Sequence, residues 1–290
     1  NNIILGIKLD NYVKYNEKDS NLNKLYTYYS DNSYMNYNNN YNGIPYSIIK
    51  KQLDNKLNLS YTNISTYFKC KFRFLLDNIY KLAPYKETIS QRIGNLFHDV
   101  LYEVYKNDIK DYDKVINEVV DKYFDKDSNK DKFYIEKYRK ALKQLISLLD
   151  EQLSKTDYHN EYFEEWFSVE KENDLNIKIL GKIDKVLTLK DNDNTYVIVV
   201  DYKTGALHGD FNKVVHGFDM QLLYYLYLIK NSNKINNPKF TGMYLQSIMT
   251  DVLGSTKNKT YEELIKDNMK LFGYTISSLD RLYEIDHNYN

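Results

Sequence analysis

The spacing of apolar residues divides the chain into a helical part and a strand-rich part. Between Ser90 and Leu153, apolar residues recur every three or four positions, which predicts amphipathic helices that each bury one face. We expect these helices to start at Ser90 and to span 114–124 and 132–153, with an earlier helix from Ser60 to Ile79. Side-chain oxygens at Ser60 and Ser90 can accept hydrogen bonds from the first free N–H groups of a helix, which supports both starts.

After Leu153 the spacing of apolar residues changes from every three or four positions to every second position. Residues 165–170 and 177–189 alternate apolar and polar side chains, as half-buried strands do. Tyr196–Val200 (YVIVV) follows a turn at 191–194 and is a continuous run, typical of a central strand buried on both faces. A helix over 220–229 and a strand over 240–247 complete the pattern. The order predicts an α/β fold in which a central mixed β-sheet is flanked by helices, with a helical N-terminal half.

The first 58 residues differ from the rest in composition. They are rich in Asn and Tyr, and the tract 36–42 (NYNNNYN) predicts a solvated loop. Short helices are predicted over 25–29 and 44–57. We interpret 1–58 as a linker or the tail of a preceding domain, and 59–290 as one domain.

The overall composition narrows the class of protein. A hydrophobic fraction of 42% with 28% charged residues is typical of a globular protein in water, and no apolar run approaches the roughly 20 residues that span a bilayer. The single cysteine, Cys70, excludes an internal disulfide and suits a reducing compartment. We therefore expect a cytoplasmic protein without membrane contact. The zero net charge argues against binding DNA by overall charge alone, but not against a local site.

Two acidic residues and a lysine follow the predicted central strands. Asp184 closes the segment Gly181–Asp184, and Asp201 comes directly after the buried VIVV run, with Lys203 two positions later. Residues i and i+2 of a strand share a face, so Asp201 and Lys203 are expected to project together. Two carboxylates form the oxygen-rich pocket that Mg²⁺ accepts, and a lysine can orient water or offset charge on a phosphate. The simpler interpretation is a pair of turn-capping carboxylates and a salt bridge.

These residues stand in an ordered set of motifs. The sequence has Gly94-x-x-x-His98, Gly181-Lys-Ile-Asp184, Asp201-Tyr-Lys-Thr-Gly205 and Gln221-Leu-Leu-Tyr-Tyr225, preceded by Ser65-Thr-Tyr-Phe-Lys-Cys70-Lys-Phe-Arg-Phe74. This set resembles the nuclease domain of AddB-type subunits, in the RecB-like branch of the PD-(D/E)XK nuclease superfamily. The match departs from the family at Lys71, where a proline is usual. The resemblance extends over about residues 59–275 and implies a restriction-endonuclease-like core.

The resemblance also implies roles for individual residues. It makes His98, Asp184, Asp201 and the backbone carbonyl of Tyr202 ligands of Mg²⁺, with Mn²⁺ as the expected substitute, and it makes Asp184, Asp201 and Lys203 catalytic residues. It places Gln221 and Tyr225, one helical turn apart, against the DNA strand. Glu165 is a candidate for an additional acidic residue.

The family also holds a 4Fe–4S cluster on four cysteines, for which Cys70 would be the first ligand. One thiolate cannot hold such a cluster. We therefore expect none in this 290-residue chain, which we interpret as lacking the cysteine-rich C-terminal end of the family domain.

The function implied is that of a Mg²⁺-dependent exodeoxyribonuclease. In an AddAB-type helicase–nuclease it would act in double-strand-break repair and recombination, as the partner of an AddA-type helicase subunit, and would prefer single-stranded DNA. Two alternatives stay open. One is a non-catalytic module that binds DNA or a partner protein with the same fold, and the other is a stand-alone restriction-type endonuclease.

Overall fold

The computed structural model describes residues 2–24, 43–84, 86–106, 109–172, 174–205, 207, 211–249 and 259–289. The chain divides into two compact units, Asn1–Ile49 and Lys50–Asn290. In the first unit, helix α1 (Asn2–Tyr15) buries Leu9, and Lys8 forms an ion pair with Asp19. The helix predicted over 25–29 and the loop predicted over 36–42 lie outside the described residues.

The second unit carries the elements that the apolar pattern predicts. Its helices, with α3 beginning in the first unit, are α3 (Tyr46–Gln52), α4 (Tyr61–Lys69), α5 (Lys71–Phe74), the π-helix η2 (Leu75–Ile79), α6 (Ile89–Lys106), α7 (Tyr112–Tyr123), α8 (Asn129–Leu153), α9 (Phe211–Val214), α10 (Gln221–Asn231), α11 (Tyr261–Asn268) and α12 (Leu279–Ile285). Its strands are β1 (Lys56–Leu59), β2 (His159–Glu172), β3 (Asn176–Asp191), β4 (Asn194–Lys203), β5 (Pro238–Ser247) and β6 (Phe272–Thr275). Within these residues no helix combines the length and the apolar character needed to cross a membrane.

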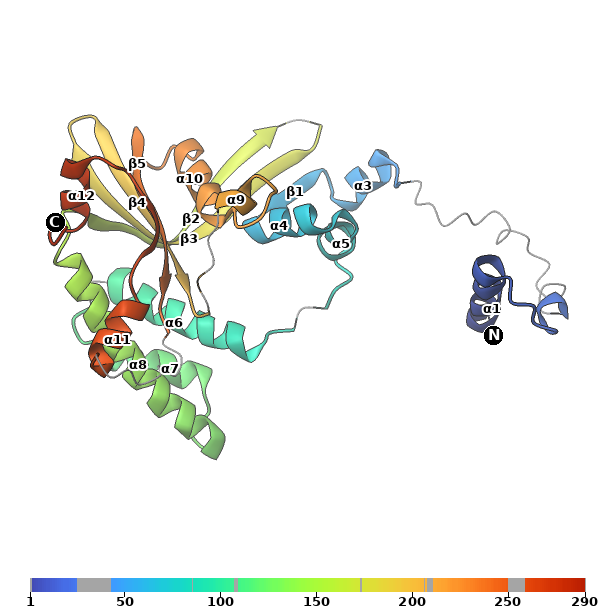
Figure 1. Cartoon of the computed structure of the whole chain (residues 1–290), viewed down its shortest axis with the longest axis horizontal. Coiled ribbons are helices and arrows are strands. Elements are labelled where there is room, and N and C mark those ends of the chain that lie inside the picture. The colour runs from blue at the N-terminus through green and yellow to red at the C-terminus, as the bar shows by residue number, and fades with distance from the viewer. Residues whose placement is uncertain are drawn as a thin grey trace. The chain divides into compact units, whose positions relative to one another are not determined.

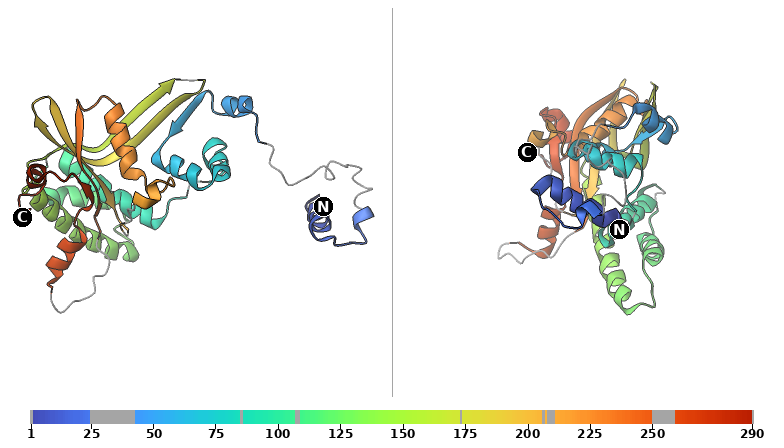
Figure 2. Two further views of the ribbon diagram at one scale, coloured as in Figure 1. Left: turned by 45° about the horizontal axis from the view of Figure 1, so that its top comes forward. Right: turned by 90° about the vertical axis from the view of Figure 1, so that its right-hand side faces the viewer.

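The six described strands form one mixed sheet, as predicted. The order is β1-β3-β4-β5-β6, with β2 paired to β3. β2 and β3 are antiparallel over nearly their whole length, whereas β4 pairs with β3 only from Lys185 to Asp191. The ribbon of β2 and β3 therefore extends beyond β4, as Figure 2 shows, and β1 pairs with its far part.

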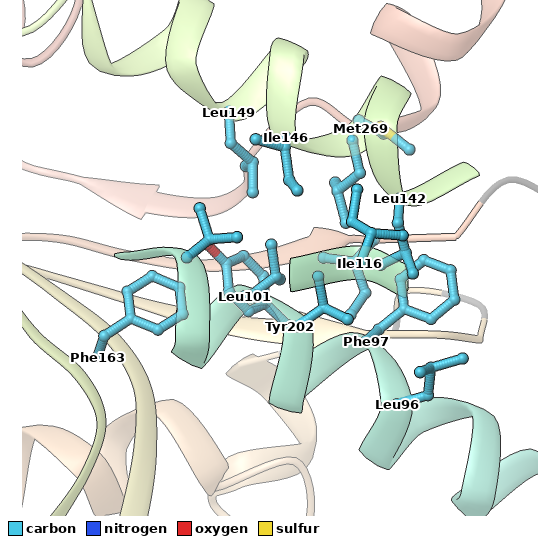
Figure 3. Packing of buried hydrophobic residues seen from close by; sticks show 14 of the residues in the cluster. Leu96, Phe97, Leu101, Ile116, Leu142, Ile146, Leu149, Phe163, Tyr202 and Met269 are labelled. Carbon is cyan, nitrogen blue, oxygen red and sulfur yellow. The ribbon is translucent and has the colours of Figure 1, made fainter. Parts of the chain in front are cut away.

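Helices cover both faces of this sheet (Figure 1). On β4, Ile198, Val200 and Tyr202 pack in one core with α6, α7 and α8. Figure 3 shows Tyr202 and Phe163 of the sheet beside the apolar side chains of these helices. The intervening residues of β4, Val197 and Val199, pack in a second core with α10. Burial of both faces explains the uninterrupted apolar run of β4.

The ribbon of β2 and β3 bends at Glu164. Phe163 packs in the core with α6, but Phe167 packs in the core with α10, although a regular strand would direct both to one face. Glu164 between them has a φ of +49°, an uncommon conformation for a residue with a side chain. On β3, Ile183 and Leu187 are divided between the two cores in the same way. The bend turns the far half of the ribbon toward α10.

Several predicted helix boundaries were wrong. The short helix predicted over 44–57 ends at Gln52, and Lys56–Leu59 is strand β1. The helix that starts at Ser60 does so with a capping box to Asn63, but it ends at Lys69 because Cys70 takes an extended conformation (φ −160°). The next helix begins before Ser90, because the Thr88 hydroxyl accepts a hydrogen bond from the N–H of Gln91 (3.2 Å). The Gln91 side chain in turn accepts one from the N–H of Thr88 (2.9 Å). Sequence alone favoured the serine over this equally suitable threonine.

Lys185 is a buried charged residue that lowers the stability of this fold. It is 3% exposed on the α8-facing side of β3, and within the described residues no carboxylate lies within 4 Å of its ammonium group. Burial lowers the pKa of Lys185 from 10.5 to about 8, although Asp150 acts in the opposite direction. The unfolded chain therefore binds this proton more tightly, so the cost is complete below about pH 8 and disappears as the pH rises toward 10.5.

We predict that Lys185→Met raises the free energy of unfolding at pH 7 by about 1–3 kcal/mol, because it removes a buried, unpaired charge. Urea denaturation at pH 7 and pH 9.5 checks this, and the gain over the wild type is expected to shrink at the higher pH. Lys190→Met, an exposed site on the same strand, is the matched control and is expected to change stability by under about 0.5 kcal/mol. A Lys185→Met variant less stable than the wild type at pH 7 would contradict this account.

Candidate active site

The site begins where the pairing of β3 and β4 ends. The last paired residues are Lys185 and Val200, so Asp184 and Asp201 come one step beyond the ladder. There the N–H of Tyr202 donates a hydrogen bond to Oδ2 of Asp184 (2.6 Å), and the carboxylate replaces the missing strand partner. Both aspartates are buried. The end of the ladder therefore fixes one oxygen of Asp184 and leaves the other facing α6.

Three side chains from three different elements meet at this oxygen. His98 of α6, Glu164 of β2 and Asp184 of β3 each offer one ligand atom, and these atoms lie within 4.8 Å of one another. Nδ1 of His98 is hydrogen-bonded to Oε1 of Glu164 and lies 3.8 Å from Oδ1 of Asp184. Ligands about 2.0–2.2 Å from one ion lie up to about 4.4 Å apart. One imidazole and two carboxylates at separations close to that limit are suited to bind a divalent cation.

The electrostatics of the site favour a cation as well. Burial, and then the neighbouring Asp201, raise the pKa of Asp184 to about 8. The Glu164 carboxyl is also buried, but His98 and the Lys182 ammonium, 2.7 Å from Oε2, lower its pKa overall. Burial by itself would lower the pKa of His98, yet the surrounding carboxylates raise it. Burial therefore makes ionisation of these carboxylates costly, and positive charge at this point stabilises their ionised forms.

Lys203 and Asp201 share a face of β4, as their spacing predicts. The Lys203 ammonium lies 2.6 Å from Oδ2 of Asp201 and donates a hydrogen bond to Oε1 of Gln221 (2.7 Å). The amide of Gln221 donates to Oδ1 of Asp201 (2.7 Å) and to the hydroxyl of Tyr225 (2.9 Å). The Lys203 side chain is one-third exposed, whereas Asp201 is fully buried. The Lys203 ammonium group therefore lies between the buried carboxylates and solvent.

Asp201 lies beside the three-residue cluster rather than within it. Its carboxylate is held by Lys203 and Gln221, and burial raises its pKa while Lys203 lowers it. Oδ2 of Asp201 has no hydrogen bond of normal geometry to any described residue, despite the nearby ammonium. A buried carboxylate oxygen with a free lone pair is suited to bind a cation or an ordered water. Its role as a metal ligand stays a prediction.

The glycine of the Gly181–Asp184 motif lets α10 approach this site. A Cβ at Gly181 would lie 2.9 Å from Cδ1 of Leu228 and 3.2 Å from the Tyr224 ring. The Tyr224 hydroxyl in turn is 2.8 Å from the carbonyl oxygens of both Leu59 and Leu180. These contacts hold α10 on the ribbon, so that Gln221 and Tyr225 at its start lie over Asp201.

The acidic residue that joins His98 and Asp184 is Glu164, not the neighbouring Glu165. The side chain of Glu165 is partly exposed and pairs with Lys234, 2.6 Å away. The registers Phe163 to Lys185 and Glu165 to Ile183 place Glu164 opposite Asp184. Counting back along both strands from the turn that joins β2 and β3 would have found it. The contact of Lys182 with Glu164 was also missed.

Two other residues with predicted roles are Tyr202 and Cys70. The Tyr202 side chain points into the core with α6, and the ligand role of its carbonyl stays a prediction. Cys70 is an exposed free cysteine at the start of α5, where its sulfur accepts a hydrogen bond from the N–H of Arg73 (3.4 Å). Its role as a cluster ligand in a longer protein also stays a prediction.

Comparisons with known proteins point to one family. Residues 58–275 match the family model described as "PD-(D/E)XK nuclease superfamily". The chain is 26% identical over 269 residues to an ATP-dependent helicase/deoxyribonuclease subunit of Clostridium perfringens (strain 13 / Type A), and the match covers 80% of this chain and 23% of that protein. It is also 26% identical over 291 residues to the protein of the same name from Caldanaerobacter subterraneus subsp. tengcongensis, where the match covers 86% of this chain and 24% of that protein.

The chain therefore spans about a quarter of the length of the curated relatives that it matches. The family model covers well over half of the chain and includes α6, α10 and strands β2 to β6 in full. It includes all the site residues described above. The chain belongs to the PD-(D/E)XK nuclease superfamily.

Proposed function

We propose that this chain is the Mg²⁺-dependent, DNA-cleaving domain of an AddB-type helicase–nuclease subunit. The observation that carries the proposal is the His98–Glu164–Asp184 cluster, with the ammonium group of Lys203 on the neighbouring strand. Fold membership alone does not imply catalysis, because function depends on the site. Here His98, Asp184, Asp201 and Lys203 of the family motifs are present, and they lie together where the pairing of β3 and β4 ends.

The metal would be held by His98, Glu164 and Asp184, with Asp201 beside them. When bound, a divalent cation polarises the scissile phosphate, activates water and offsets developing negative charge. Oxygen ligands favour Mg²⁺, and the single imidazole explains why Mn²⁺ is expected to substitute. We assign Asp184 and Asp201 to the catalytic centre as acidic residues of the superfamily motif.

We assign Lys203 as the catalytic residue on the solvent side of the site. Its ammonium group can donate a hydrogen bond to a phosphate oxygen or orient the attacking water, and it stabilises the charge of the transition state. Gln221 and Tyr225 are proposed to contact the DNA strand. Their hydrogen bonds support a positioning role in addition, because Gln221 bridges Lys203 and Asp201 and Tyr225 supports Gln221.

The wider assignments follow from the names of the relatives. A subunit of an ATP-dependent helicase/deoxyribonuclease acts with a helicase, so we propose an AddA-type partner subunit and a cytoplasmic role in double-strand-break repair and recombination. Unwinding by that partner would deliver single strands, which we propose as the preferred substrate.

In a longer protein, the exposed Cys70 would supply one ligand of a 4Fe–4S cluster. Neither alternative function, the non-catalytic module or the restriction-type endonuclease, is favoured by a specific observation.

The first prediction concerns the catalytic lysine. With linear single-stranded DNA and Mg²⁺, Lys203→Met and Asp201→Asn are each expected to lower the cleavage rate about 100-fold or more. The first change removes the cation that stabilises the transition state, and the second removes the carboxylate that holds this cation in place. Gel-based time courses measure the rate. Lys239→Met, an exposed lysine of β5, is the control and is expected to cleave at the wild-type rate. Wild-type activity in the Lys203→Met variant would refute the assignment.

A second prediction separates the proposed exonuclease from a restriction-type enzyme. The wild type is expected to degrade linear single-stranded DNA while leaving a closed circle of the same sequence intact, because it requires a free end. Both substrates are incubated under the same conditions, with EDTA as the metal-free control. Discrete fragments from the circle would favour an endonuclease, and no cleavage of either substrate would favour the binding module.

A third prediction uses two neighbouring glutamates as a matched pair. Glu164→Gln is expected to weaken Mn²⁺ binding about 10–100-fold, whereas Glu165→Gln, the same change one residue later, is expected to leave it within about twofold. Calorimetric titration with Mn²⁺ measures both affinities without any need for DNA. If Glu165→Gln weakens binding and Glu164→Gln does not, the metal site has been assigned to the wrong side of the bend.

A further inference from the structure

A cavity lies on the face of the sheet that α8 covers, and none of the carboxylates of the nuclease site lines it. It has a volume of about 520 Å³, within the usual range for small-molecule pockets. Its floor is formed by strands β3, β4 and β5, and its walls by α8, α12 and the segment that joins α11 to β6. The lining is mainly apolar and includes Leu187, Ile198 and Val200 of the sheet and Leu148, Leu282 and Ile285 of the helices. None of these residues belongs to the cluster around Asp184.

Two buried polar side chains that line this cavity each have a polar group without a partner among the described residues. Lys185 is 3% exposed, and its ammonium group has neither an ion pair within 4 Å nor a hydrogen bond to any described residue. Gln246 is 1% exposed, and its Oε1 accepts no hydrogen bond within the described part of the chain. Its amide nitrogen is already used, since it donates to Gln152 (2.8 Å) and to the carbonyl of Met269 (2.9 Å). The cavity wall therefore offers one unused cation and one unused acceptor.

The acidic residue that acts on Lys185 does not form an ion pair with its ammonium group within 4 Å. Asp150 acts on Lys185 electrostatically, but its two carboxylate oxygens accept hydrogen bonds from the hydroxyls of Tyr105 and Tyr112, each at 2.9 Å. At the rim, Glu151 is paired with Lys155 (2.7 Å) and Lys266 (2.8 Å). Buried polar groups are nearly always paired, and a buried charge without a partner is strongly destabilising. A group that persists at such a cost points to a partner from outside the chain.

The chemistry of the lining defines that partner. An apolar cavity binds a hydrocarbon body, the Lys185 ammonium can donate hydrogen bonds to one carboxylate, and Oε1 of Gln246 can accept one from a water or a ligand hydroxyl. We propose that this cavity is a binding site for a small amphipathic carboxylate, with its acid group on Lys185 and its apolar body against Leu187, Ile198 and Val200. The site is separate from the nuclease cluster, since none of His98, Glu164, Asp184, Asp201 and Lys203 lines the cavity. α12, which lines the cavity, is held to the 155–157 segment by hydrogen bonds, including the one from the Asp157 N–H to the Glu284 carbonyl (2.9 Å).

Calorimetric titration of the full chain with decanoate, a carboxylate on a straight apolar chain, tests this proposal. We expect saturable binding of one molecule per chain. Lys185→Met is expected to weaken it about tenfold or more, and Lys190→Met, which removes an exposed lysine from the same strand, is expected to leave it unchanged. Thermal unfolding of each variant confirms that it is folded.

Two further measurements make the result specific to the cavity. Leu271→Trp, at a partly exposed position in the cavity lining, is expected to weaken decanoate binding by filling the space. The uncharged analogue 1-decanol is expected to bind the wild type and Lys185→Met equally. Absence of saturable decanoate binding by the wild type would overturn the proposal. So would equal affinity in Lys185→Met, or an equal loss in Lys190→Met.

Discussion

The candidate active site depends on the point where the ladder between β3 and β4 ends. Beyond Lys185 and Val200 the two strands no longer pair, and the side chain of Asp184 accepts the N–H of Tyr202 in place of a backbone carbonyl. A buried backbone donor must find an acceptor, so the carboxylate is fixed by a requirement of the fold itself. On the other side of β3, the left-handed conformation of Glu164 bends the paired strands. Both irregularities occur at one level of the sheet, and they direct two carboxylates toward His98.

Charged residues from other elements of the domain compensate the buried carboxylates at this level of the sheet. Burial makes each carboxylate costly to ionise, and two of them have cationic neighbours: His98 and Lys182 for Glu164, and Lys203 for Asp201. Asp184 is the exception, since it has the N–H of Tyr202 and the more distant His98, and its pKa is raised to about 8. A divalent cation at this point would complete the compensation. The site and the fold are therefore coupled through the same charges.

Much of this arrangement could be predicted from the sequence. The period of apolar residues predicted the mixed sheet and the helices on both its faces, and the i, i+2 spacing placed Asp201 and Lys203 together. Glu164 was missed because strict alternation of a regular strand was assumed, and a local bend changes which residue faces the site. β1 was missed because four residues are too short for a periodic signal and take their conformation from pairing with β3. Lys185 was overlooked because periodicity does not reveal a charged residue in an apolar core.

The central claim is that a single divalent cation is bound between a helix and the two strands that bend at Glu164. Anomalous diffraction from crystals of this chain soaked in Mn²⁺ tests it most directly. The account predicts one strong peak within bonding distance of His98, Glu164 and Asp184. A peak elsewhere, or no peak at this position in crystals that hold Mn²⁺ at other sites, would contradict it.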